Sequence, residues 1–567
     1  MKDIKNKNEI DVKIKVTPFT DDYCCENVEE PKDRYYRFKQ NFFQRTYQSI
    51  IEFLASIPSK VFNFFVTLLP LFIVNCYKKV VTEIKDIFIT FKKGDFKTRA
   101  SFLIFGFGHL FRGQILRGLL FLVFEIVFVF YMIFFGWKYL SLLGTLGNVA
   151  QTEYLDPESG MEMIINNDNS FLILLYSALT IFFIIAAIYM WRLNIKQNKI
   201  SQELLEIGIK PKKAKDDLKS IADSEYHKTL LAIPTFGLLL FTILPMILMV
   251  IIAFTNYDNI HEPPKALFTW VGISNFVEML GGGLSINSKL FFYTFKQVLL
   301  WTIIWAIFAT FSNYILGMIV AMLINKKGIK LKKLWRSILI VTVAVPQFVS
   351  LMLLSQMLGP NGAVNDVLVD IYRFFTVDFI NFLINTIGKL NGGITNFLTN
   401  IQANAPAFKG LPFLTDTLWA RATVIIVNIW VGIPYTMLIC TGILMNIPED
   451  LYESAKIDGA SPLRMYAKIT LPYMLFVTGP YLLNQFIGNI NNFNVIFLLT
   501  GGDPKTLDYQ FAGKTDLLIT WLYKLTVNER NFKLASVIGI LVFVIIATIS
   551  LIFYSRSNAV KNEEDFR

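Results

Sequence analysis

Long apolar stretches are the feature of this sequence that most constrains what it can fold into. A helix needs about 20 mainly apolar residues to cross the hydrocarbon core of a bilayer, and eight segments come close to or exceed that length. We therefore predict an all-α membrane protein with about eight transmembrane helices. The expected spans run from about 115 to 136, 169 to 191, 229 to 254, 292 to 324, 335 to 357, 419 to 446, 472 to 499 and 533 to 555.

Composition and charge support a membrane protein and argue against nucleic-acid binding. Hydrophobic residues make up 54% of the chain and charged residues 17%, whereas about a quarter of the residues in an average soluble protein are charged. The net charge of +11 comes largely from short basic runs beside the apolar spans. Such runs orient helices against the cytoplasmic face. Membrane lipid is therefore an expected partner, and nucleic acid is not.

Lysine and arginine are unevenly distributed over the connections between spans. Basic clusters lie at 192–219 and 326–336, whereas the connection 137–168 contains one base, Lys138, and several acids. Because positively charged loops stay in the cytoplasm, we expect both termini and residues 447–468 to be cytoplasmic. The opening residues show no cleavable signal peptide, so the first long span is expected to direct insertion.

A shorter apolar segment, residues 61–76, contains Pro70 and is flanked by Lys60 and Lys78. Such a segment could cross the membrane or lie in its surface as an amphipathic helix. We favour the interfacial helix, because a ninth span would break the charge alternation of the connections that follow.

No metal, cofactor or nucleotide site is expected on this chain. The four cysteines show no metal-ligand spacing, and the three histidines lie far apart. Gly513, Lys514 and Thr515 resemble the end of a phosphate-binding loop, but Asp508 stands where the first glycine of that motif would be needed. ATP is therefore not expected to bind here.

The connection at residues 445–472, MNIPEDLYESAKIDGASPLRMYAKITLP, has the local signals of two short helices and a hinge. Pro448 followed by two acids suits a first helical turn. Gly459 can end that helix in a left-handed conformation, and Ser461 followed by a proline suits the N-cap of the next helix. The first helix also has an apolar side, which a solvated loop would not need.

This connection resembles the EAA loop of ABC-importer permeases. The matching residues are Glu453, Ser454, Ala455, Asp458 and Gly459, followed at the family's spacing by Ile469, Leu471 and Pro472. A serine stands where the first alanine of the pattern is usual. The resemblance implies a coupling helix that docks on an ABC ATPase subunit dimer. It also implies that ATP is hydrolysed by that dimer and that this chain is not an enzyme.

Further stretches resemble the MalF-type permease of maltose and maltodextrin importers. They are AVPQFVSL (344–351), VNIWVGIPYTMLICTGIL (427–444), NNFNVIFLLTGGDP (491–504) and AGKTDLLITWLYKLT (512–526). The resemblance implies a type I ABC-importer permease in a bacterial cell membrane that carries maltodextrin-type oligosaccharides inward. It further implies a second, MalG-like permease and an extracytoplasmic sugar-binding protein as partners. Another sugar, such as galacto-oligosaccharides, remains an alternative substrate.

The expected organisation follows from the spans and the resemblance. It comprises a cytoplasmic tail with the possible interfacial helix (1–100), accessory transmembrane helices (101–255), a short extracytoplasmic loop (256–291), the permease core (292–556) with its coupling loop (446–472), and a cytoplasmic tail (557–567). The large insertion of enteric relatives cannot fit into the short loop, whereas the outer loop 358–418 is longer than the family usually shows. Amphipathic helices are expected in that longer loop.

Polar side chains inside apolar spans predict the sugar site. The run 485–494, QFIGNINNFN, places neutral amides among aromatic residues. Amides offer donors and acceptors to sugar hydroxyls, although interhelical hydrogen bonding is an alternative role for each of them. The resemblance assigns substrate contacts to Asn428, Val431, Gly432, Tyr435, Gln485, Gly488, Asn489, Asn492 and Asn494, and more weakly to Gln347 and Ser350.

Two rival functions fit the sequence less well. An ion-coupled secondary transporter is expected to carry ionisable residues at mid-membrane depth. The spans 335–357 and 472–499 contain no such residue between their charged flanks. A membrane scaffold without a substrate would leave the polar run 485–494 unexplained.

Overall fold

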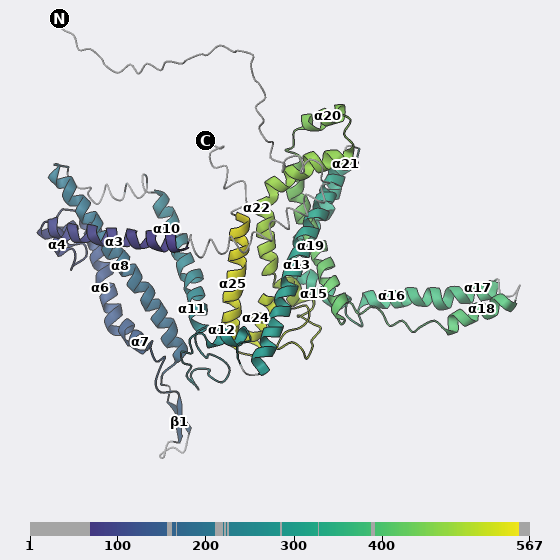
Figure 1. The fold of residues 1–567 in the computed structure, drawn as a ribbon, viewed down its shortest axis with the longest axis horizontal. Coiled ribbons are helices and arrows are strands. Elements are labelled where there is room, and N and C mark those ends of the chain that lie inside the picture. Colours follow the sequence, from purple (N-terminus) through teal and green to yellow (C-terminus); the bar gives the residue numbers. More distant parts are fainter. Residues whose placement is uncertain are drawn as a thin grey trace, which may run out of the picture. The chain divides into compact units, whose positions relative to one another are not determined.

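The computed structural model describes residues 69–155, 162–165, 167–209, 219, 223, 226–283, 286–326, 328–386 and 392–554. The chain divides into two compact units at Tyr77–Lys78, and the second unit holds nearly all of the described helices (Figure 1). Helix α3 (Leu69–Lys93) begins in the first unit and ends in the second. The predicted tail up to residue 68, the first half of segment 61–76 and the tail 557–567 lie outside the described residues, whereas the second half of that segment forms the start of α3.

The fold class predicted from the sequence is confirmed, because the described chain is almost entirely helical. Six continuous helical segments are long and apolar enough to span a membrane, counting only described residues. They are Ile115–Leu142, Ser170–Glu206, Leu230–Ile252, Ile286–Asn325, Thr417–Leu444 and Phe532–Leu551. The count of eight spans stays a prediction, since its two further segments are both interrupted.

The accessory helices that follow α3 form a group held together by polar contacts near the start of the group. Their elements are α4 (Phe96–Ala100), α5 (Phe107–Leu110), α6 (Ile115–Tyr131), the π-helical turn η2 (Met132–Gly136), α7 (Trp137–Leu142) and α8 (Ser170–Glu206). The connection between α7 and α8 contains a feature that the sequence did not predict. Strands β1 (Thr152–Leu155) and β2 (Glu162–Ile165) pair there as an antiparallel hairpin.

The third accessory span continues into a compact connection that is fastened to the last helix. It consists of α10 (Tyr226–Leu238), the π-helical turn η3 (Leu239–Ile243) and α11 (Leu244–Ile252), and the connection contains α12 (Ser274–Met279). Asp258 in this connection bonds Lys533 of helix α25 (Phe532–Tyr554) over 2.8 Å. Tyr257 stacks on Phe532, with ring centroids 4.3 Å apart.

The core is built around one long helix, α13 (Ile286–Asn325), which packs against α19 (Thr417–Leu444) and α22 (Leu471–Ile490). Buried residues from all three helices, among them Tyr314, Met437 and Met474, form one apolar cluster. A second cluster joins α13 to α24 (Leu518–Val527) and α25. These clusters fix the three helices that carry most of the predicted site.

Two segments that the sequence predicts as single spans are interrupted in the structure. The segment 335–357 is divided into α14 (Lys332–Ala344) and α15 (Gln347–Met357), because Pro346 lacks an amide hydrogen and forces Val345 into an extended conformation. The segment 472–499 is divided into α22 and the short helix α23 (Asn494–Leu499). Asn492 lies in this second interruption, and its Oδ1 accepts a hydrogen bond from the Val495 amide over 3.2 Å.

The long connection 358–418 contains helices, as predicted. They are α16 (Ala363–Arg373), the π-helical turn η4 (Phe374–Asp378), α17 (Phe379–Thr386) and α18 (Gly392–Ala403). The start of α16 is fixed by the Asn365 amide, which bonds the Gly359 carbonyl and both backbone groups of Leu411. The connection 445–470 contains α20 (Glu449–Ile457), α21 (Pro462–Met465) and the π-helical turn η6 (Tyr466–Thr470).

Candidate functional site

A cavity of about 60 Å³ lies where the three core helices α13, α19 and α22 meet. All of its lining side chains are uncharged, and most of them are polar or aromatic. They are Ala309, Thr310, Asn313 and Tyr314 from α13, Gly432, Tyr435 and Thr436 from α19, and Tyr481, Leu482 and Gln485 from α22. A neutral cavity with hydroxyl and amide groups suits an uncharged, hydroxyl-rich ligand better than an ion.

Two amide side chains at this cavity have polar atoms without a protein partner. The Asn313 Oδ1 and the Asn428 Nδ2 are both buried, and neither forms a hydrogen bond with the described part of the chain. The Asn313 Nδ2 contacts the Asn428 backbone carbonyl over 3.4 Å, so the two residues are neighbours. An unsatisfied buried polar group costs about 1–3 kcal/mol. A ligand that supplies the missing partners would recover that cost.

Glycine at position 432 allows α13 and α19 to approach each other at the cavity. A Cβ atom at Gly432 would lie 2.5 Å from the Asn313 Nδ2, so a larger residue would displace that amide. One turn along, Gly317 lies against Thr436 in the same way, since a Cβ there would meet the threonine Cβ at 2.7 Å. The two glycines therefore allow α13 and α19 to lie close together at the cavity and beside it.

Aromatic rings form another part of the lining. Tyr435 and Tyr481 lie with ring centroids 6.4 Å apart, and Tyr435 is half exposed. Each of these tyrosines follows a proline inside its helix, Pro434 in α19 and Pro480 in α22. A proline inside a helix removes one backbone hydrogen bond and favours bending at that point. Both helices can therefore bend next to the cavity.

The amides of the 489–492 turn are already engaged by the protein. The Asn489 Nδ2 donates to the Thr310 Oγ1 over 2.9 Å, and its carbonyl accepts from the Trp305 indole over 3.1 Å. The Asn492 Nδ2 donates to the Asn489 Oδ1 over 3.5 Å. These contacts tie α22 to α13, which is the interhelical role that the sequence left open for them.

The predicted site residues therefore separate into two groups. Gly432, Tyr435 and Gln485 line the cavity, and Asn428 lies beside it. Val431, Gly488, Asn489, Asn492 and Asn494 are not among the lining residues. The structure adds Thr310, Asn313 and Tyr481. Asn313 could have been found as an amide within an apolar span, but Thr310 and Tyr481 carry no such signal.

A larger cavity of about 220 Å³ lies outside the core helices, at the base of α16. It is lined by residues 358–365 and 409–415, which belong to one long connection. Its amide, Asn365, is bonded to backbone groups on both sides, as described above. This cavity contains a lysine, Lys409, and lies outside the three core helices, so the smaller, uncharged cavity is the better candidate for a transport path.

The predicted coupling loop has the local geometry that its sequence indicates. Helix α20 begins after Pro448 and ends before Gly459, which has a φ of +71°. Ser461 caps α21 by accepting a hydrogen bond from the Arg464 amide over 3.4 Å. The apolar side chains of Ile457 and Leu463 are 86% and 81% exposed, so this loop has an uncovered apolar surface.

Comparison with known proteins identifies the family. Residues 313–559 match the family described as binding-protein-dependent transport system inner membrane component. The chain is 32% identical to the maltodextrin transport system permease protein MdxF of Bacillus subtilis (strain 168), over 82% of this chain and 95% of that protein. The chain belongs to the MalF-type permeases of binding-protein-dependent importers. Permeases of this family are subunits of ABC transporters and are not themselves enzymes.

Two further relatives bear on this permease. The maltodextrin transport system permease protein MalC of Streptococcus pneumoniae serotype 4 is 31% identical over 82% of this chain and 96% of its own length. The galactooligosaccharides transport system permease protein GanP of Bacillus subtilis (strain 168) is 33% identical over 60% of this chain and 72% of its own length. The family match begins at Asn313, so it includes that cavity residue together with α19, α20 and α22.

Metal ligands and carboxylates were also located relative to the cavity. The described residues contain no group of three or more His, Cys, Asp and Glu side chains that could hold a metal ion. Asp258 and Asp516 lie in connections between helices, and no carboxylate is among the residues that line the cavity. Burial raises the pKa of the Asp516 carboxyl, while its 2.6 Å contact with Lys524 opposes that rise.

Proposed function

We propose that this permease carries maltodextrin-type oligosaccharides into the cytoplasm through the cavity between α13, α19 and α22. A separate ABC ATPase dimer supplies the energy, a second permease completes the path, and an extracytoplasmic binding protein delivers the sugar. The main support is the cavity itself, whose neutral lining combines tyrosine rings with the Asn313 Oδ1, an amide atom without a protein partner, while the unpartnered Asn428 Nδ2 lies beside it. The names of the relatives support the same substrate class.

The chemistry of the lining suits a sugar in two ways. Hydroxyl groups both donate and accept, so one sugar hydroxyl can accept from the Asn428 Nδ2 while another donates to the Asn313 Oδ1. Apolar faces of sugar rings can lie on the exposed ring of Tyr435. The cavity has to widen to admit an oligosaccharide, and the prolines before Tyr435 and Tyr481 give α19 and α22 points at which to bend.

The experiment that tests this proposal measures ATP hydrolysis by the reconstituted complex with its binding protein, titrated with maltodextrin. Asn428→Ala should raise the sugar concentration for half-maximal stimulation by roughly 5- to 150-fold, which corresponds to about 1–3 kcal/mol. The matched control is Asn400→Ala, an exposed amide on α18, which should leave the titration unchanged. Equal titrations for wild type and Asn428→Ala would reject the cavity as the sugar site.

Galacto-oligosaccharides are the alternative substrate, because GanP is also similar to this chain. The same titration with both sugars separates the two. Stimulation by galacto-oligosaccharides alone would replace maltodextrin as substrate and leave the transport path in place.

The orientation and the coupling role are proposed from the charge pattern and the α20–α21 loop. Both termini and this loop would then be cytoplasmic. In a background without native cysteines, a membrane-impermeant thiol reagent added to intact cells should miss Ser461→Cys and label Leu507→Cys, whose side chain is fully exposed. The reverse labelling would overturn the orientation.

The coupling role is tested by the variant Gly459→Val. A left-handed residue with a side chain is strained by about 1–2 kcal/mol, so this variant should disturb the loop. Loss of sugar-stimulated ATP hydrolysis, with the complex still assembled, would support coupling through this loop.

A further inference from the structure

Helix α3 has an apolar stripe that the described part of the chain leaves largely exposed. Val80, Ile84, Phe88 and Phe91 follow one another at intervals of four, four and three residues, which places them on one side of a helix. Their exposed fractions range from 48% to 68%, with Phe88 the most exposed. A stripe of this length needs a cover that is itself apolar.

Two acids of α3 that lie outside this stripe fasten the helix to the end of α8. Glu83 forms an ion pair with Arg192, and Asp86 forms one with Lys199 at 2.8 Å. Arg192 is the first charged residue after the apolar part of α8, which runs from Phe171 to Trp191. The ion pairs therefore place α3 beside the point where α8 leaves the hydrocarbon layer.

The end of α3 is fixed at the same depth by aromatic and backbone contacts. The Phe91 ring meets the Phe102 ring at 5.2 Å, and Phe102 meets the ring of Trp191 at 5.9 Å. The Arg99 guanidinium donates to the Phe91 carbonyl over 3.0 Å and to the Lys92 carbonyl over 2.8 Å. Trp191 is a residue type that favours the membrane interface. The last residue of the stripe, Phe91, is therefore connected through the Phe102 ring to Trp191 at the interfacial end of α8.

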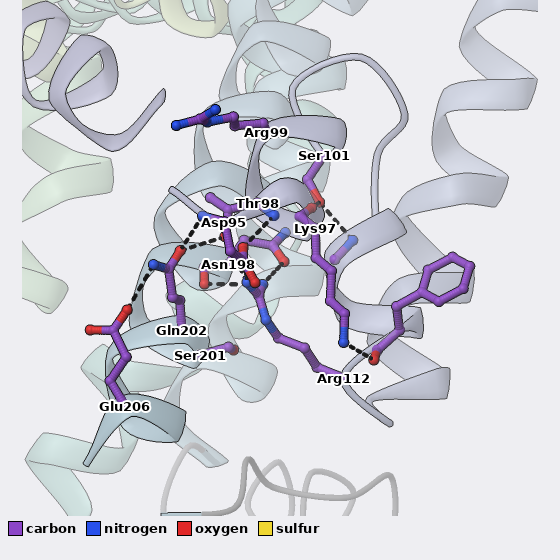
Figure 2. A network of polar contacts seen from close by, with 12 residues as sticks. Asp95, Lys97, Thr98, Arg99, Ser101, Arg112, Asn198, Ser201, Gln202 and Glu206 are labelled. Atoms are coloured by element: carbon purple, nitrogen blue, oxygen red, sulfur yellow. Dashed lines mark hydrogen bonds and ion pairs between the residues drawn. The ribbon is translucent and has the colours of Figure 1, made fainter. Parts of the chain in front are cut away.

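The turn after α3 is locked by the polar junction drawn in Figure 2. Asp95 accepts from Arg112 at 2.5 Å, and its backbone amide donates to the Gln202 side chain over 3.1 Å. Arg112 also donates to Asn198 over 2.9 Å and to Thr98 over 2.7 Å. Because Asn198 and Gln202 belong to α8, the junction prevents α3 from swinging away from that helix.

A row of lysines lies on the other side of the apolar stripe. Lys78, Lys85 and Lys92 are seven residues apart, so they share one side of the helix, and all three are exposed. Lysines beside an apolar stripe place their amines at the depth of lipid phosphates while their carbon chains cover apolar surface. Each such lysine near an anionic surface adds to membrane attraction.

We propose that α3 is a membrane-surface helix, whose apolar stripe inserts between lipid headgroups and whose lysine row binds anionic phospholipid. Three observations carry this assignment together: the largely exposed stripe, the lysine row beside it, and the attachment to the first residues of α8 beyond its apolar part. The helix would then hold the accessory group against one leaflet of the bilayer.

The test uses the full chain, with its native cysteines replaced, in phospholipid nanodiscs. A fluorophore is attached to Phe88→Cys on the stripe or to Thr82→Cys, which is exposed on the opposite side of α3. Lipids with brominated acyl chains should quench the label at position 88, and aqueous iodide should not. The label at position 82 should respond in the reverse way. Iodide quenching at position 88, or shielding of that label from both quenchers, would overturn the proposal.

A second measurement addresses the lipid charge. Brominated phosphatidylglycerol should quench the label at position 88 about twofold more strongly than brominated phosphatidylcholine at the same mole fraction. The variant Lys78→Gln, Lys85→Gln, Lys92→Gln should lose this preference. The control variant Lys289→Gln, Lys296→Gln, Lys505→Gln has the same net charge and should keep it. Equal quenching by both lipids in the wild type would refute anionic-lipid binding. Neither readout requires transport, so its failure is separate from failure of the proposed transport function.

Discussion

Two groups of polar side chains in this permease differ in how many of their polar atoms have partners, although the Arg112 Nε at the junction also has none in the described part of the chain. At the junction of Figure 2, the terminal nitrogens of Arg112 donate to Asp95, Thr98 and Asn198, and those residues bond one another or α8. At the cavity, the Asn428 Nδ2 and the Asn313 Oδ1 have no partner in the described part of the chain. Polar groups that satisfy each other hold helices together, whereas unsatisfied ones beside a cavity are available to a ligand.

The largest loss of folding stability is expected when Arg112 at the junction is replaced. The Arg112 side chain is 1% exposed, so Arg112→Ala leaves a carboxylate and two further acceptors without their donor. Asp95 is 42% exposed, so the loss comes mainly from the hydrogen bonds to a charged group and should be about 2–3 kcal/mol. Thermal unfolding of the purified permease should shift to lower temperature. Uptake per folded complex should stay near the wild-type value, and a loss of sugar affinity instead would break the distinction between the two groups.

Arg112→Lys is the matched control for that variant. Lysine keeps the charge but lacks the planar fork that reaches several acceptors at once. We expect a stability between those of the wild type and Arg112→Ala. Wild-type stability in both variants would show that the junction is not structural.

The second test compares two asparagines within the core. Asn489→Ala removes the donor to Thr310 and should lower the free energy of unfolding by about 1–2 kcal/mol. Asn428→Ala removes an amide whose nitrogen has no partner, so it should leave thermal stability unchanged or slightly higher. Paired measurements of unfolding temperature and sugar-stimulated ATP hydrolysis sharpen the comparison. The distinction fails if Asn428→Ala destabilises the protein as much as Asn489→Ala does.

The sequence could predict the coupling loop in more detail than the sugar site, for a physical reason. Pro448, Gly459 and Ser461 act on the backbone of their own neighbours, and the structure has the helix start, the left-handed residue and the cap where these residues indicated them. The role of Asn489 depends instead on Thr310, which lies 179 positions away. Whether a buried amide bonds another helix or faces a cavity is therefore decided by packing, which a single sequence does not contain.

The predicted spans show the same limit. Apolar length located the six continuous membrane helices, and Pro346 explains why the segment 335–357 is interrupted. The hairpin of β1 and β2 was not predicted. The sequence of its connection indicated the orientation in the membrane through its charges but gave no sign of strands. Local rules thus predicted the elements well, and contacts between distant elements remained open.

A smaller loss of sugar response is expected at Gly432, where α19 touches α13 beside the cavity. In Gly432→Ala the new Cβ would lie 2.5 Å from the Asn313 Nδ2, so that amide has to move. Overpacking of this size costs about 1 kcal/mol when a flexible side chain can yield. Gly479→Ala on α22 is the control, since a Cβ there meets no atom within 4 Å. A weaker response to sugar in Gly432→Ala, with little change in unfolding temperature, would confirm that Asn313 belongs to the binding group.

The smallest expected effect is a change of stability with pH. It tests whether the contacts of Asp258 with Lys533 and His261 stabilise the protein as the junction does. Burial alone would raise the pKa of Asp258, but hydrogen bonds from Lys533 and His261 outweigh it and lower the pKa to about 2. At the junction, burial likewise opposes the contacts from Thr98 and Arg112, which prevail and lower the pKa of Asp95. A carboxyl with a lowered pKa in the folded state stabilises the protein above the unfolded pKa of about 4. That contribution is lost as the pH falls from about 4 towards 2.

Thermal unfolding between pH 7 and pH 3 measures this contribution. Asp258→Asn should be less stable than the wild type at pH 7, and the difference should shrink at the acidic end of the range. Asp366→Asn, which removes an exposed carboxylate on α16, is the control and should run parallel to the wild type. The cavity is lined by uncharged side chains, so the stability difference between Asn428→Ala and the wild type should not vary with pH. A pH-independent loss of stability in Asp258→Asn would mean that the charge of Asp258 does not hold the connection to α25. Asp258 would then not stabilise the protein in the way proposed for Asp95 at the junction.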